Sequence, residues 1–116
     1  MSELKKSFEI ARDKNNIGLI LPEFLSAKFS IVGVNDDTNE GSFSYALTKS
    51  PSNTEMCITV SENPKLVSFE KWSNVRLKGR QLLETVPENA GILIVYETGG
   101  DYITRRQINW FLEILD

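Results

Sequence analysis

Apolar residues recur with helical spacing near the start of the chain. Leu4, Phe8 and Ala11 fall at positions i, i+4 and i+7, which places them on one face of a helix. Ser2 can cap this helix, and charged residues occupy its opposite face. The pattern predicts a helix over Ser2–Lys14 that packs through its apolar side.

The same spacing recurs at the end of the chain. Thr104 and Gln107 have the spacing of a capping box. The core positions of the helix that they begin are Ile108, Phe111, Leu112 and Leu115. Trp110 and Ile114 form a second apolar stripe. This stripe is either buried with the first or lies at the rim of the core, where a partly exposed Trp is a typical anchor for a protein partner.

Three runs in the middle of the chain have the pattern of β-strands. Residues 29–34 are apolar on both faces, which is typical of a central strand. Residues 42–48 and 55–61 alternate between apolar and polar positions. In the last run we expect the inward positions to be Met56, Ile58 and Val60. The short connections between the runs predict an antiparallel β-meander.

The remaining segments add helices and further strands. Pro22 favours a short helix within residues 17–27, and Pro64 begins another. A short strand over residues 74–78 and a helix over residues 79–86 follow, and residues 92–96 are apolar at every position, as in a buried strand. A length of 116 residues is that of one domain. The sequence therefore predicts a single α+β domain over residues 1–116, in which a meander with added strands is packed by helices, including the capped C-terminal helix.

Four segments, taken in order, resemble a known family. They are LKKSFEIARDKNN with PEFLSAKFSIVG, then EMCITVSENPKLVSFEKW, then LKGRQLLETVPENAGILIVYETGG, and finally ITRRQINWFLEIL. In this order they are similar to the helices, strands and capped last helix of the N-terminal domain of the SseB family of bacterial proteins. The turn at residues 96–100 departs from the family, which often has an Asn-Pro-Gly-like turn there. The resemblance implies the fold and implies no enzymatic activity, catalytic residue or cofactor.

Composition limits the chemistry available to the chain. It has no histidine and one cysteine, Cys57, which excludes Ser–His–Asp and Cys–His catalysis and a Cys-rich zinc site within the chain. We expect Cys57 to be a small buried or half-buried hydrophobe. A net charge of −3 argues against a nucleic-acid-binding surface over the whole protein. The sequence has no run long enough to cross a membrane and no signal-peptide core, so we predict a cytoplasmic protein. Because the composition offers no histidine-based catalysis and no Cys-rich zinc site, we also predict a non-enzymatic protein without metal or cofactor.

Two groups of cations and aromatic residues are candidates for a partner-binding surface. One lies within residues 65–80, where five cations accompany Phe69 and Trp72. The other is in the first turn of the last helix, where a pair of arginines opposes the helix dipole and is expected to face outward. The simpler interpretation is solvated charge beside core aromatics. The candidate partner-binding residues are Trp72, Arg76, Arg105, Arg106 and Trp110.

Glu97 and Asp101 flank a Gly-Gly turn and are a candidate ligand turn. Two carboxylates placed together can bind a cation or exchange protons with a substrate. Turns also favour acidic residues for conformational reasons alone. Both interpretations of the pair remain open at this point.

Two functions follow from these residues. The first is a non-catalytic protein-interaction module, one version of which is an immunity-type protein that binds and neutralises a toxin domain. Its partner can also be a second copy of the chain. The second is a small-ligand or anion-binding domain in bacterial metabolism or stress response, with its site near residues 97–106. An exposed apolar patch near Trp110 or Trp72 favours the first function, and a concave pocket with convergent polar groups favours the second.

Overall fold

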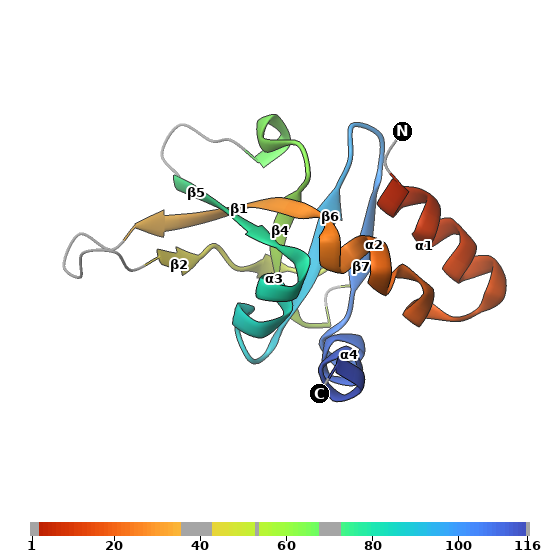
Figure 1. Cartoon of the computed structure of the whole chain (residues 1–116). Coiled ribbons are helices and arrows are strands. Elements are labelled where there is room, and N and C mark those ends of the chain that lie inside the picture. Colours follow the sequence, from red (N-terminus) through yellow and green to blue (C-terminus); the bar gives the residue numbers. More distant parts are fainter. Residues whose placement is uncertain (1–2, 36–42, 53, 68–72, 116) are drawn as a thin grey trace.

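A mixed β-sheet forms the centre of the protein, and helices pack against it (Figure 1). It is seen in a computed structural model, which describes residues 3–35, 43–52, 54–67 and 73–115. The helices are α1 (Glu3–Lys14), η1 (Ile17–Ile20), α2 (Leu21–Ser26), η2 (Pro64–Val67), α3 (Gly79–Thr85) and α4 (Arg105–Leu115), of which η1 and η2 are 3-10 helices. The strands are β1 (Lys28–Asn35), β2 (Phe43–Tyr45), β3 (Thr48–Lys49), β4 (Met56–Ser61), β5 (Ser73–Lys78), β6 (Ala90–Val95) and β7 (Gly100–Ile103). The predicted α+β class is confirmed.

Strand β1 is central in the sheet, as its two apolar faces predicted. It pairs antiparallel with β5 on one edge and with β4 and β2 on the other. Strand β4 pairs in parallel with β6, and β6 pairs antiparallel with β7. A parallel pair needs a crossover connection, and here η2, β5 and α3 lie between β4 and β6 in the chain.

The middle run of the predicted meander is divided into two strands. β2 pairs with the end of β1, and β3 pairs with the beginning of β4. Strands β1 and β4 also pair directly, with Ser30 opposite Ser61 and Ile31 opposite Val60. The run over residues 43–49 therefore pairs with β1 through its first part and with β4 through its second.

Helices and sheet share one apolar core. Helix α1 buries Leu4, Phe8 and Ala11, and α4 buries Ile108 and Phe111, as the helical spacing predicted. The sheet supplies alternate residues from neighbouring strands, which therefore lie on one face: Phe29, Ile31, Ile58, Val60, Ile92, Ile94 and Ile103. Within the described residues, none of the helices has both the length and the apolar character needed to cross a bilayer.

One expected core residue is exposed. Met56 was predicted to point inward, but 40% of its surface is accessible. It is the first residue of β4, so it lies at an end of the strand, where alternation alone does not ensure that another element covers it. Cys57 beside it is fully buried, which confirms that prediction.

Strand β7 was not predicted, because Gly99, Gly100 and Asp101 have the composition of a turn. Only Gly99 has the left-handed conformation, with φ of 80°. Gly100 is already paired with Val95 in the sheet. An added Cβ at Gly100 would lie 2.6 Å from the carbonyl oxygen of Ile94, so glycine is needed there for close strand approach.

Candidate functional site

The predicted capping box begins α4. The backbone N–H of Thr104 donates to Gln107 Oε1 at 3.0 Å, and the backbone N–H of Gln107 donates to Thr104 Oγ1 at 3.1 Å. These two bonds satisfy backbone donors that the first turn of a helix otherwise leaves without partners. They fix where α4 starts and hence which side chains its exposed face presents.

The expectation of an outward-facing Arg105 is wrong. Its Nε donates to the carbonyl oxygen of Ala90 at 3.0 Å, and its guanidinium also donates to the Pro87 carbonyl and to Asn109 Oδ1. Burial lowers the pKa of this guanidinium. Arg105 therefore joins α4 to the turn between α3 and β6, and its cation is used within the fold.

Arg106, Trp110 and Ile114 are exposed along α4, and we call them the α4 surface. Trp110 is 42% exposed and Ile114 is 49% exposed, whereas Phe111 between them is fully buried. The second apolar stripe therefore lies at the rim of the core. An open cavity of about 390 Å³ adjoins it, lined by Arg106, Gln107 and Trp110 and by residues 15–17 at the start of η1.

Trp110 is held in place by its neighbours. Its ring centroid lies 5.6 Å from that of Phe111. On the side of η1, an added Cβ at Gly18 would be only 3.1 Å from the Trp110 ring, so the indole packs closely over this glycine. The part of the ring that solvent reaches is thus presented in a fixed orientation.

Arg76, from the first group of predicted cations, does not join the α4 surface. Arg76 lies on β5, which β1 and β4 separate from β6. Its guanidinium donates to Ser30 Oγ at 3.0 Å and to the carbonyl oxygen of Glu62 at 3.3 Å, so it ties β5 to β1 and to the end of β4. Trp72 lies outside the described residues.

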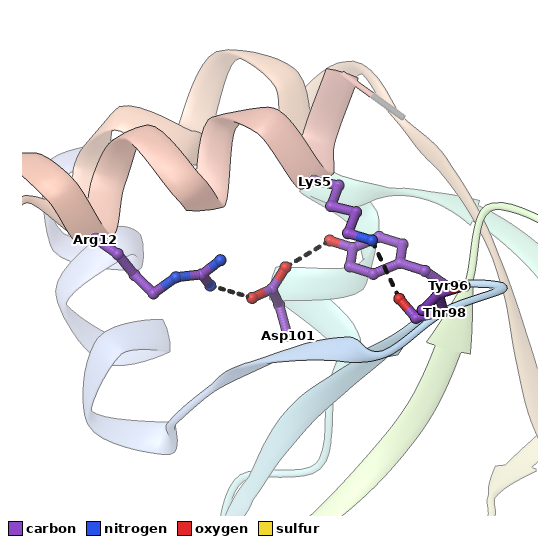
Figure 2. Close-up of polar contacts among 5 residues, drawn as sticks. All are labelled: Lys5, Arg12, Tyr96, Thr98 and Asp101. Carbon is purple, nitrogen blue, oxygen red and sulfur yellow. Dashed lines mark hydrogen bonds and ion pairs between the residues drawn. The ribbon is translucent and has the colours of Figure 1, made fainter. Parts of the chain in front are cut away.

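The hairpin of β6 and β7 is attached to α1 by a polar network (Figure 2). Asp101 accepts from Arg12 at 2.5 Å and from the hydroxyl of Tyr96 at 2.9 Å, and its side chain is only 7% exposed. Lys5 donates to the carbonyl oxygen of Thr98 at 3.1 Å and lies 5.6 Å from the centre of the Tyr96 ring. Burial raises the pKa of the Tyr96 phenol, and the hydrogen bond to Asp101 raises it further.

The two carboxylates of the candidate ligand turn do not share one site. Both oxygens of Asp101 are bonded within the network under α1. Glu97 is exposed and lines a different space, a cavity of about 380 Å³. Asp101 is therefore part of the fold, and of the two residues only Glu97 reaches this cavity.

This cavity lies where the parallel strands β4 and β6 end. Its lining includes Lys5 from α1, Asn63 and Leu66 after β4, and Tyr96, Glu97 and Thr98 after β6. In open sheets with parallel strands, ligands bind outside the carboxyl ends of those strands. Sequence reasoning found Glu97 but missed Lys5 and Asn63, because only the β4–β6 pairing and the docking of α1 bring them to it.

Glu55 is a further residue that the sequence did not point to. Its Oε2 accepts from the hydroxyl of Tyr102 at 2.5 Å and from the backbone N–H of Arg105 at 3.0 Å. A carboxylate from the turn before β4 thus satisfies a free donor at the start of α4. No sequence motif signals a partner 50 residues away.

Comparisons with models of protein families, with curated proteins and with solved structures found no match to this chain. The similarity to the SseB family therefore stays a prediction. Among the described residues, no group of three or more Cys, Asp or Glu side chains is arranged to hold a metal ion.

Proposed function

We propose that this protein is a non-catalytic protein-interaction module and that it binds its partner through the α4 surface. The observation that carries the proposal is the 42% exposure of Trp110 on a helix whose Ile108 and Phe111 are fully buried. A Trp that is partly exposed and already held in one orientation loses little conformational freedom on binding, and such residues contribute strongly to interfaces.

The rest of the α4 surface suits a protein partner. Ile114 extends the apolar area by one helical turn, and Arg106 places a cation at its edge. The adjoining cavity of about 390 Å³ has room for a partner's side chain. A toxin domain neutralised by an immunity-type protein is one version of this function, and a cytoplasmic location is part of the same proposal.

Affinity capture with a matched control tests the proposal. Wild-type protein, Trp110→Ser and Leu47→Ser are immobilised and exposed to a lysate of the native cell, and bound proteins are identified by mass spectrometry. Leu47 is a suitable control because it is 46% exposed and lies between β2 and β3. We expect one protein to bind wild type and Leu47→Ser, and to bind Trp110→Ser at least tenfold more weakly once purified, which is about 1.4 kcal/mol.

Two results would contradict this function. One is a bound protein whose affinity is the same for wild type and Trp110→Ser, and the other is no protein that depends on Trp110. Sedimentation equilibrium of wild type and Trp110→Ser tests whether the partner is a second copy of the chain. Circular dichroism of both variants verifies that they fold.

A further inference from the structure

We propose that the cavity at the ends of β4 and β6 binds a free amino acid, a small zwitterion with an apolar side chain, and that Lys5 and Glu97 are its two charged contacts. This is a different part of the molecule from the α4 surface. The binding site is therefore independent of the protein-interaction function, and either can fail without the other.

Lys5 is positioned to receive a carboxylate. Its ammonium has three N–H donors, of which one is used on the carbonyl oxygen of Thr98. That bond and the nearby Tyr96 ring hold the ammonium over the hairpin, as Figure 2 shows. Two N–H donors remain for a ligand, and a hydrogen bond between ionised groups is about twice as strong as a neutral one.

Neutral donors lie close to this cation. Asn63 Oδ1 accepts the backbone N–H of Lys65 at 3.1 Å, which fixes the amide and leaves its two N–H donors for other groups. In the part of the chain that the structure describes, neither the Asn63 amide nitrogen nor the Thr98 hydroxyl has a hydrogen-bond partner. One cation with neutral donors around it is a suitable environment for a carboxylate.

Glu97 supplies the opposite charge. Its carboxylate lines the same cavity, is exposed, and has no hydrogen-bond or ion-pair partner among the described residues. A ligand with a carboxylate alone would therefore meet repulsion here, and an amine alone would meet Lys5. A zwitterion is complementary to both charges.

The remaining wall favours an apolar side chain. Leu66, Val95 and the Tyr96 ring line the cavity between the charged groups. Its volume of about 380 Å³ falls at the lower end of small-molecule sites, which span roughly 300–1,000 Å³. An amino acid with an aliphatic or aromatic side chain fits these dimensions.

Isothermal titration calorimetry with L-leucine and L-phenylalanine tests the proposal. N-acetyl-L-leucine keeps the carboxylate and lacks the ammonium, and L-leucinamide has the reverse. These two analogues also represent the ends of a peptide, so they distinguish a free amino acid from a peptide terminus. We expect saturable binding of at least one amino acid, and binding of both analogues that is about ten- to a hundredfold weaker.

Two variants and two controls locate the site. Lys5→Met and Glu97→Gln should weaken binding about tenfold or more. Lys6→Met and Glu113→Gln change exposed charges that do not line the cavity, and should bind as wild type does. The proposal is overturned by no saturable heat with either amino acid up to about 10 mM. It is also overturned by an analogue that binds as well as leucine, or by unchanged binding to Lys5→Met while circular dichroism shows a folded protein.

Discussion

Replacing Glu55 with alanine should destabilise the fold at the point where three separate segments meet. The Glu55 carboxylate accepts the Tyr102 hydroxyl at 2.5 Å and the Arg105 backbone N–H at 3.0 Å. The variant removes both bonds, and it removes the negative charge from the N-terminus of α4. The hydroxyl and the N–H are then left without their acceptor.

The size of the effect follows from these contacts. A hydrogen bond to a charged group contributes about 1.5–3 kcal/mol, and a carboxylate at a helix N-terminus adds about 0.3–1 kcal/mol. Tyr102 and Arg105 are only half-buried, so water replaces part of what is lost. We expect the free energy of unfolding to fall by about 2–3 kcal/mol in total.

Urea unfolding measures this loss as a lower midpoint at an unchanged m-value. The matched control is Glu97→Ala, another glutamate in a loop, which has no partner within the described fold and should change stability by less than about 0.5 kcal/mol. A double-mutant cycle of Glu55→Ala with Tyr102→Phe should give a coupling energy above about 0.5 kcal/mol. If Glu55→Ala is as mild as Glu97→Ala, Glu55 does not hold α4 in place and the reasoning is wrong.

Three further predictions concern contacts of β6 and β7. Arg12→Met should lower the unfolding free energy by about 1–2 kcal/mol in urea, because it leaves the Asp101 carboxylate without its cation, and Asp101→Asn in the same chain should recover part of that loss. Gly91→Ala should cost about 1–3 kcal/mol in the same assay, because the new methyl group meets the Tyr102 hydroxyl, the Glu55 carboxylate and the Ile103 carbonyl oxygen. Adding Tyr102→Phe removes the closest of these contacts and should restore a small part of the loss, since the backbone contact with Ile103 remains. The raised pKa of Tyr96 means that the folded state keeps the phenol proton longer than the unfolded chain. Stability should therefore fall as pH rises above the ordinary pKa of 10, and urea midpoints of Tyr96→Phe across that range should fall less steeply.

The sequence predicted the elements whose own periodicity is strong. The faces of α1 and α4, the capping box at Thr104 and the central position of β1 were all predicted correctly. Each depends on residues close together in the chain, where helical or strand geometry fixes which side chains share a face. Met56 was predicted wrongly because alternation gives the face of a strand but not how far the core extends along it.

The candidate site was less predictable than the fold. The sequence named Trp110 but left open whether its stripe was buried, and the structure places it at the rim. The sequence suggested that Arg105 faces outward, but the carbonyl groups of Ala90 and Pro87 accept its donors. Whether a cation is free or bonded depends on which distant segments of the chain lie beside it, and a local sequence pattern does not show which segments these are.

By itself, the sequence determined the α+β class and the ends of the main helices, because propensity and capping act over a few neighbouring residues. It also excluded histidine-based chemistry, because the chain contains no histidine. Tertiary structure decided which charges remain available. The parallel pairing of β4 with β6 places Asn63 and Glu97 beside the same cavity, and the packing of α1 adds Lys5. The same packing buries Asp101 under Arg12. These arrangements depend on contacts between segments far apart in the chain, which form only when the whole core closes.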